Sequence, residues 1–285
     1  MLTEQKRIEL ALIANEIRKE TVKSIASIGI GHLGGSLSIV DLLAVLYFDQ
    51  MKIDPKDPKM TDRDMLVCSK GHAGPAVYSS LALKGYFDKE LLYTLNKSNT
   101  DLPSHCDMRK TPGIDMTTGS LGQGISAACG IALANRMDGK DDLYTYCIMG
   151  DGESQEGQIW EAAMFAGHRK LSNLIAFVDN NNLQIDGTVD QVCSLGDVAE
   201  KYRSFGWDAV RINGHDVAAI HNAIENAKTV KDKPSVIVLD TVKGKGIKAI
   251  ENQASNHNMN VGPDQLEAFL KELDEEACRL KGGCA

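Results

Sequence analysis

Five short apolar segments alternate along the chain with longer amphipathic segments, and this alternation limits the fold more than any other feature. The apolar segments span residues 65–69, 143–149, 173–179, 207–212 and 235–242. Helical spacing of apolar residues fills the stretches 121–137, 157–170, 197–206 and 216–230. Short strands that alternate with helices are typical of a parallel sheet with both faces covered. We therefore predict the α/β class, with a parallel sheet and helices on both faces.

Helices are also predicted towards both ends of the chain. Apolar residues recur at spacings of three and four over residues 10–28, which predicts a first helix that ends at Gly29. A second helix is predicted to begin with Ser38 as N-cap and Asp41 at the capping-box position. The last amphipathic stretch, residues 262–281, is predicted to form a closing helix.

The length and charge of the chain bound its organisation and its partners. Its 285 residues suffice for one large domain or two small ones. No repeat and no domain boundary is visible, so we expect a single domain over residues 1–285 with a frayed tail at 281–285. The net charge is −8 and no long basic run is present. This argues against nucleic acid or an anionic membrane as the main partner, but permits a local basic pocket for a phosphate.

The cysteines and the N-terminus indicate the compartment. There are seven cysteines, an odd number, and none forms a Cys-x-x-Cys pair, which is typical of reduced thiols in a cytoplasmic protein. The N-terminus mixes charges throughout and does not read as a signal peptide. The most apolar run, residues 28–48, contains a histidine, an aspartate and four glycines, which favours a turn and helix over a membrane span.

One carboxylate stands between two glycines where a buried strand ends. The strand at 143–149 stops at Gly150-Asp151-Gly152, and the next strand ends in the three asparagines 180–182. In a parallel sheet, ligands bind at the carboxyl ends of the strands. If the two strands are neighbours, their ends lie about 5 Å apart. A carboxylate and a carboxamide oxygen would then converge above the sheet.

This pair of groups has the chemistry of a metal and phosphate site. One acid and one neutral amide suit Mg²⁺ or Ca²⁺, and the single negative charge lets phosphate oxygens complete the metal's shell. The glycine N–H groups and the helix predicted at 157–170 add donors for a diphosphate. The alternative is an ordinary turn, which the asparagines at the next strand end disfavour.

The spacing of these two motifs resembles the thiamine diphosphate motif, and nearly the whole chain resembles the transketolase family. The segments that carry the likeness are GIGHLGGSLS at 29–38, SKGHAGPAVYSSL at 69–81, LPSH at 102–105, TPGIDMTTGSLGQGIS at 111–126, VKGKGI at 242–247 and SNHNM at 255–259. The string TTGSLGQG is typical of the transketolase branch and not of the deoxyxylulose-phosphate synthase branch.

The resemblance implies roles for particular residues. The implied metal ligands are Asp151, Asn181 and the main-chain oxygen of Leu183. The residues implied to face the cofactor are His72, Gly119, Leu121, Gly150, Asp151, Gly152, Glu156, Asn181, Ile185 and His257. The implied catalytic residues, which would handle protons on substrate hydroxyls and the reacting oxygen, are His32, His72, His105 and His257. Imidazole suits that task near neutral pH.

Four residues also have a plainer interpretation. In transketolases a glutamate at the place of Glu156 links two active sites across a dimer, and the alternative is an exposed helix-start glutamate favoured by the helix dipole. The remaining histidines, His168, His215 and His221, are interpreted as surface or structural residues because they lie on predicted helices or in a strand-to-helix turn.

In transketolases a second domain supplies a glutamate and an aromatic pocket for the aminopyrimidine ring, and no such unit follows residue 247 here. The resemblance therefore implies the N-terminal subunit of a split transketolase. It would need a C-terminal subunit with the pyrimidine-binding and C-terminal domains, in an α2β2 assembly. The implied reaction is a thiamine diphosphate- and Mg²⁺-dependent transfer of a two-carbon ketol unit from a ketose (phosphate) to an aldose (phosphate).

Other interpretations stay open at this point. The chain could be the alpha-type subunit of an oxo-acid dehydrogenase, although TTGSLGQG and the loop histidines argue against it. It could also be a deoxyxylulose-phosphate synthase-like enzyme, against which TTGSLGQG argues. It could also be a non-catalytic diphosphate binder, against which the intact Asp151 and Asn181 argue. A pentose phosphate is the default donor, and a sulfo-sugar or another modified ketose is the alternative.

Overall fold

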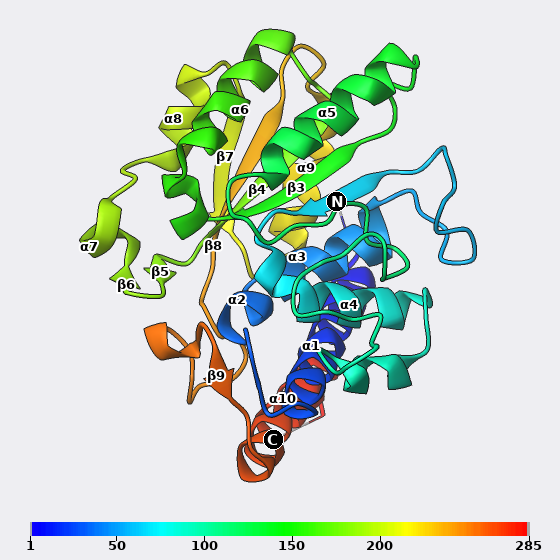
Figure 1. Cartoon of the computed structure of the whole chain (residues 1–285), viewed down its shortest axis with the longest axis vertical. Helices are drawn as coiled ribbons and strands as arrows, with labels where there is room; N and C mark the ends of the chain where they lie inside the picture. The colour runs from blue at the N-terminus through cyan, green and yellow to red at the C-terminus, as the bar shows by residue number, and fades with distance from the viewer. Residues whose placement is uncertain (1, 284–285) are drawn as a thin grey trace.

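The predicted strands form and pair side by side in one parallel sheet. The computed structural model describes residues 2–283. Within that range the central sheet has five strands in the order β2-β3-β4-β8-β7, each parallel to its neighbours (Figure 1). Their bounds are β2 (Met65–Cys68), β3 (Thr145–Gly150), β4 (Leu174–Asn180), β7 (Asp208–Asn213) and β8 (Ser235–Asp240). The predicted fold class is confirmed.

Two apolar cores lie on the two faces of this sheet. Successive strand residues point to opposite faces, so Tyr146 and Ile148 join one core while Cys147 and Met149 join the other. The helices of the first core are α1 (Glu4–Ala26), α3 (Val40–Val45), α4 (Gly74–Lys84), α9 (Val217–Thr229) and α10 (Pro263–Leu280). Those of the second are α5 (Gly124–Met137), α6 (Gly157–Arg169) and α8 (Val198–Ser204). Figure 1 shows α5 and α6 on one side of the sheet and α1, α4 and α10 on the other.

Shorter elements connect the sheet to its edges. Two small antiparallel pairs are present, β1 (Ile30–Gly31) with β9 (Met259–Asn260), and β5 (Leu183–Gln184) with β6 (Gly187–Thr188). The short helices are α2 (Gly34–Leu37), α7 (Val189–Cys193) and the π-turn η1 (Leu46–Gln50). The 3₁₀ turns are η2 (Gly71–Ala73), η3 (Lys89–Thr94), η4 (Gly152–Gln155) and η5 (Ala254–Asn256).

The predicted start of the second helix is wrong. Helix α3 begins at Val40 with Ile39 as its N-cap, and no side chain caps it. The Ser38 hydroxyl instead donates to the Asp179 carboxylate at 2.6 Å. Asp41 pairs with Arg18. Buried carboxylates require partners, and this requirement outweighs the local capping preference of the two side chains.

The predicted closing helix is present as α10 and packs along α1 (Figure 1). Phe269 and Leu273 are buried in the core, and Leu266 packs against it. The Asn15 amide of α1 donates to the carbonyl of Leu273 at 2.8 Å, which ties the two helices together. Leu270, another apolar residue of α10, is half-buried and lies outside the core.

The cysteines follow the prediction at five positions. Cys68, Cys106, Cys129, Cys147 and Cys193 are free thiols. Cys278 is disulfide-bonded, so the expectation of reduced thiols is wrong there. The seventh cysteine and the end of the predicted frayed tail, residues 284–285, lie outside the described residues. No helix within residues 2–283 is both long enough and apolar enough to span a membrane.

Candidate active site

Four histidines from four separate segments meet beside the carboxyl ends of the strands. His32 follows β1, His72 lies in η2 after β2, His105 lies in the loop before Gly119, and His257 follows η5. The ring centroid of His32 lies 5.4 Å from those of His72 and His257 and 5.5 Å from that of His105. The rings of His72 and His257 are 5.1 Å apart. The structure thus places the four predicted catalytic histidines side by side.

Burial lowers the pKa of each of these imidazoles. It lowers the pKa of His257 to about 4, with the nearby Lys243 ammonium as the second cause. Burial and then Lys70 lower the pKa of His72 well below its usual value. The pKa values of His32 and His105 are also lowered, mainly by burial. The rings are therefore neutral at pH 7, and each offers one donor and one acceptor nitrogen to a hydroxyl.

A pocket of about 260 Å³ opens next to this cluster. Every residue predicted to face the cofactor or the metal lines it except Gly119: these are His72, Leu121, Gly150, Asp151, Gly152, Glu156, Asn181, Leu183, Ile185 and His257. Gly119 lies against His105 instead, where an added Cβ would stand 3.3 Å from the ring, and its φ of +154° favours glycine. Gly119 therefore shapes the histidine cluster and does not line the pocket.

Asp151 is the acid at the floor of the pocket. Strands β3 and β4 are neighbours, with Gly150 opposite Asp179 in the register. The ends of the two strands therefore lie side by side, as the predicted approach of Asp151 to the asparagines requires. The carboxylate of Asp151 is 3% exposed and accepts hydrogen bonds from the N–H of Gly152 at 2.7 Å and of Asn182 at 2.5 Å. Burial and then the Asp179 charge raise the pKa of Asp151 to about 6. A divalent cation would favour the ionised form of this carboxyl.

The three asparagines after β4 have different environments. Asn180 donates to Asp240 at 2.9 Å, and Asn182 adopts a left-handed conformation with φ of +57°. Of the three, Asn181 lines the pocket. Its carboxamide donates to Asp179 at 3.0 Å, and its oxygen accepts from the N–H of Leu183 at 3.0 Å. This arrangement supports the choice of Asn181 as the metal-facing amide.

Asp179, which no sequence motif indicated, joins four segments at this edge of the sheet. Its fully buried carboxylate accepts from Ser38, from Lys70 at 2.5 Å, from Asn181 and from Thr241. Burial alone would raise the pKa of Asp179, but the Lys70 ammonium and the hydroxyl donors outweigh it and hold the pKa below its usual value. Asp179 therefore stays ionised and fixes the loops that carry the predicted ligands.

Two buried lysines face the pocket, and both were missed. Lys70 is 2% exposed and bonded to Asp179. Lys243, also 2% exposed, lies 3.2 Å from the carbonyl of Leu183 and 3.2 Å from Nδ1 of His257. Within residues 2–283 it forms no ion pair, and burial followed by the charge of Lys70 lowers its pKa to about 8. Each lysine precedes a glycine just beyond a buried strand, a sequence signal that could have identified both.

Glu153 is a third missed residue, and it supports the turn after β3. Its buried carboxylate accepts from the Ser69 hydroxyl and from the N–H groups of Gly122 and Gly150, each of these two at 3.0 Å. Glu156, in contrast, is exposed at the pocket rim, as both interpretations of it require. Ile185 is 67% exposed at the same rim.

The donor set fits thiamine diphosphate with a divalent metal. A buried lysine without an ion pair calls for an anion, and the diphosphate is one. One carboxylate, one carboxamide and one carbonyl line the same pocket, as a hard cation prefers. The described residues contain no group of three or more histidine, cysteine or acidic side chains placed to hold a metal.

Known proteins are similar to this chain in sequence and architecture. Residues 10–277 match the family described as transketolase, thiamine diphosphate binding domain. The chain is 54% identical over 272 residues to a 6-deoxy-6-sulfo-D-fructose transketolase subunit of Clostridium sp. (strain MSTE9), covering 95% of this chain and 98% of that protein. It is 39% identical over 272 residues to one of the apulose-4-phosphate transketolase subunits of Phocaeicola vulgatus, covering 95% and 96%. The crystal structure of transketolase from Campylobacter jejuni matches with a TM-score of 0.86 at 34% identity, covering 94% of this chain and 42% of that one.

Proposed function

The chain belongs to the transketolase family, and from this premise we propose that it is the N-terminal, thiamine diphosphate- and Mg²⁺-binding subunit of a split transketolase. The assembled enzyme would transfer a two-carbon ketol unit from a ketose to an aldose. Residues 1–285 would form one diphosphate-binding domain. The observation that carries this proposal is the meeting of four neutral imidazoles beside the pocket that contains Asp151, Asn181 and Leu183.

The pocket residues divide the task of holding the cofactor. Asp151, the Asn181 carboxamide and the carbonyl of Leu183 would hold Mg²⁺. Lys243 would face the diphosphate, whose charge offsets the cost of burying the ammonium. The N–H groups of Gly150 and Gly152, expected from the sequence to serve the diphosphate, instead donate to Glu153 and Asp151. Thiamine diphosphate, when bound, supplies the carbon nucleophile that cleaves the bond next to a ketose carbonyl.

The histidines would move protons on the sugar. Cleavage between C2 and C3 of a ketose turns the C3 hydroxyl into an aldehyde, so that hydroxyl must lose its proton. On transfer to the aldose, the acceptor oxygen must gain one. Neutral imidazoles can hydrogen-bond a hydroxyl in either sense. The ring centroids of His32 and His105 are 5.5 Å apart, and neither residue lines the cofactor pocket. We propose that the substrate extends from the pocket toward these two rings.

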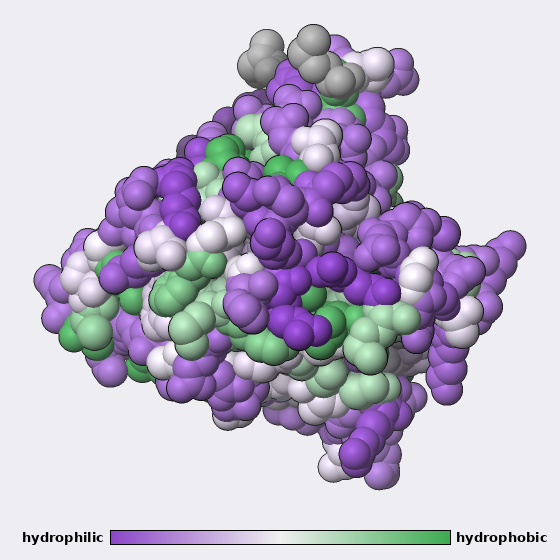
Figure 2. All heavy atoms as spheres, turned by 90° about the horizontal axis from the view of Figure 1, so that it is seen from above, coloured by the Kyte–Doolittle hydropathy of each residue, from purple (hydrophilic) through white to green (hydrophobic). Residues whose placement is uncertain are grey.

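A second subunit would complete the site. Ile185 is 67% exposed at the rim of the pocket, which leaves an apolar side chain free for a covering chain. Large apolar side chains are also exposed on α5 and α6: Met137 at 79%, Met164 at 58% and Phe165 at 43%. Figure 2 shows apolar side chains gathered on the face seen from above, the side where Figure 1 places these helices. We assign these surfaces to a C-terminal transketolase subunit, in a cytoplasmic α2β2 assembly.

The donor proposed for this enzyme is 6-deoxy-6-sulfo-D-fructose. Support comes from the 54% identity to the subunit named for that ketose, against 39% to the subunit named for apulose 4-phosphate. Removal of two carbons from this six-carbon ketose would leave a four-carbon aldose that keeps the sulfonate. An aldose phosphate would accept the two-carbon unit.

The test is reconstitution with the partner. The chain is co-purified with the product of the neighbouring gene and supplied with thiamine diphosphate, Mg²⁺ and a three-carbon aldose phosphate. We expect a five-carbon ketose phosphate to form with 6-deoxy-6-sulfo-D-fructose as donor, and less of it with fructose 6-phosphate or apulose 4-phosphate. A preference for either of those ketoses overturns the donor, and no transfer from any ketose overturns the split transketolase.

A further inference from the structure

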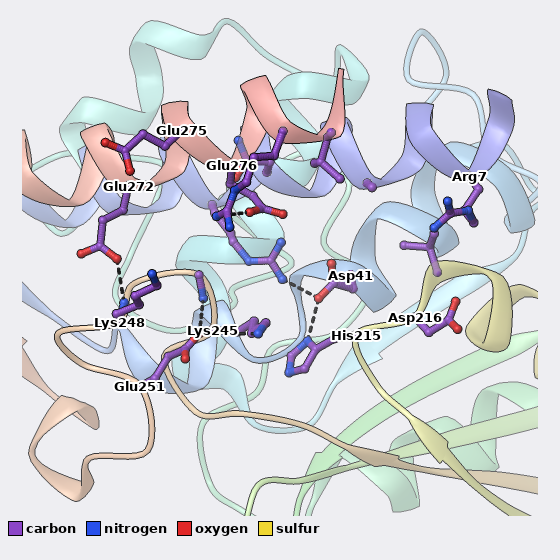
Figure 3. Close-up of a pocket in the computed structure, with 17 residues that line it drawn as sticks. Arg7, Asp41, His215, Asp216, Lys245, Lys248, Glu251, Glu272, Glu275 and Glu276 are labelled. Atoms are coloured by element: carbon purple, nitrogen blue, oxygen red, sulfur yellow. Dashed lines mark hydrogen bonds and ion pairs between the residues drawn. The ribbon is translucent and has the colours of Figure 1, made fainter. Parts of the chain in front are cut away.

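A buried chain of polar groups lies behind the cofactor pocket. Arg18 of α1 pairs with Asp41 of α3, and their residues are 7% and 5% exposed. The same carboxylate oxygen of Asp41 lies 2.7 Å from Nδ1 of His215. Figure 3 shows His215 pointing its ring toward Asp41, beside a polar cavity of about 550 Å³ that lies between α1, α10 and the loop at 245–251. These three residues do not line the cofactor pocket.

The far nitrogen of His215 makes a contact that selects the tautomer of the neutral ring. Nε2 accepts a hydrogen bond from the main-chain N–H of Val242 at 2.8 Å. A nitrogen that accepts from an N–H carries no proton, so the proton of the neutral ring is on Nδ1. Nδ1 then donates to Asp41, and the second hydrogen bond orients the ring. The ring thereby links Asp41 to the main chain beyond β8.

Val242 stands next to the lysine that faces the cofactor pocket. Thr241 is held on one side by its hydroxyl contact with Asp179, and Val242 is held on the other by His215. Lys243 follows directly, with its ammonium 3.2 Å from the carbonyl of Leu183. The N–H of Gly244 then donates to the carbonyl of Gly34 at 3.1 Å. The segment that aims Lys243 is therefore fixed at successive residues, and His215 supplies one of the fixing contacts.

We propose that Arg18, Asp41 and His215 form a positioning relay that sets the main chain at Val242 so that Lys243 reaches the diphosphate. The inference rests on the proposed function, since it takes the bound anion to be the cofactor. Arg18 holds Asp41, Asp41 holds the ring, and the ring holds the N–H of Val242. Loss of the ring acceptor leaves that N–H without its partner and frees the segment to shift.

Two substitutions of His215 distinguish a specific effect on cofactor binding from a general loss of stability. His215→Asn keeps a donor near Asp41 but loses the acceptor for Val242, whereas His215→Gln keeps an acceptor at the position of Nε2. We expect His215→Asn to weaken thiamine diphosphate binding about tenfold or more, the equivalent of ~1.4 kcal/mol. His215→Gln should stay within about threefold of wild type, because the Val242 contact survives. The turnover number at saturating cofactor should change little in either.

A matched control is available on α9. His221 pairs with Asp49 at 2.6 Å, a similar histidine–aspartate contact, and neither residue lines the cofactor pocket. His221→Asn should lower the melting temperature of the chain about as much as His215→Asn, without a change in cofactor affinity. Calorimetric titration of the assembled complex with thiamine diphosphate at fixed Mg²⁺ gives the affinity, and thermal unfolding without cofactor gives the stability.

A double-mutant cycle with Lys243→Met decides whether the relay acts through the lysine. If it does, His215→Asn should weaken binding little further once the ammonium is gone. Equal losses of affinity in the two backgrounds overturn the relay, as does unchanged affinity in His215→Asn. The wild-type titration separates the two levels: no binding by the wild-type complex rejects the proposed function and the relay together, whereas wild-type binding with unaffected variants rejects the relay alone.

Discussion

Asp151 contributes the only carboxylate among the three proposed metal ligands. Asp151→Asn keeps the volume and removes the charge, so we expect the dependence of cofactor binding on Mg²⁺ to disappear while the fold is retained. Titrations with thiamine diphosphate, with and without Mg²⁺, measure this. Asp190→Asn, at an exposed position on α7, is the control and should behave as wild type. A variant Asp151→Asn that keeps the metal dependence would refute the assignment.

The same carboxyl predicts a pH dependence. Burial and Asp179 raise the pKa of Asp151 from 3.8 to about 6. A metal binds the ionised form, so protons compete with it below that pH, and the apparent Mg²⁺ affinity should fall about tenfold per pH unit there. Above pH 6 the Asp151 carboxyl is ionised, so it should cause no further change in the Mg²⁺ affinity. A Mg²⁺ titration between pH 5 and 8 checks the slope, and an affinity that rises on acidification contradicts it.

His72 and His32 separate two tasks within the histidine cluster. His72 lines the cofactor pocket, whereas His32 lies beside it. His32→Ala and His72→Ala should each slow turnover of the assembled enzyme by about 10² to 10⁴, the usual contribution of a positioned acid or base. Cofactor affinity should survive in His32→Ala and weaken in His72→Ala. Turnover within about threefold of wild type would make the histidines structural.

At the scale of elements, periodicity located the strands and most helices but not the polar contacts between them. The apolar runs at 143–149 and 173–179 became β3 and β4 within one or two residues, because burial on both faces leaves a strong local signal. Ser38 has an equally clear local signal as a helix cap, yet it bonds Asp179, 141 residues away in sequence. Periodicity carries no information about such long-range partners.

The candidate site shows the same difference between residues with a local sequence signal and residues whose partners are distant in sequence. Asp151 and Asn181 stand at strand ends with glycine or asparagine neighbours, so their chemistry is visible from the motif. Asp179 reads as the ordinary end of a strand, and the glycine after Lys70 marks the lysine without naming its partner. The pairing of the two emerges only when the fold brings the ends of β2 and β4 to the same side of the sheet. Buried ion pairs therefore need the fold before they can be assigned.

Helix α10 provides a test at this scale. Leu273 is fully buried against α1, so Leu273→Ala should destabilise the chain by about 2–5 kcal/mol. Leu270→Ala removes the same atoms from a half-buried position outside the core and should cost clearly less. Urea unfolding of the two variants gives the comparison. Equal losses of unfolding free energy in the two variants would mean that α10 is packed on more than one face.

At the scale of the whole molecule, a single chain lines the cofactor pocket, and no element within residues 2–283 covers the exposed side chain of Ile185 at its rim. A chain that supplied the missing wall would need a large contact, since permanent hetero-complexes commonly bury about 2,000 Å² or more. The exposed side chains of Met164 and Phe165 on α6 offer an apolar starting point for it. An enzyme of this design would be inactive until both chains assemble.

The last prediction tests that surface. Met164→Asp and Phe165→Asp place a charge where an apolar contact is expected, and each should weaken assembly with the partner chain about tenfold or more. Both side chains already face solvent in the single chain, so its melting temperature should change little. Val210→Asp on the edge strand β7, a position 37% exposed, adds the same charge elsewhere and should leave assembly intact. Analytical ultracentrifugation of the mixed subunits gives the affinity. Normal assembly by both α6 variants would place the partner on another face, and loss of assembly in Val210→Asp would show that added charge alone is disruptive.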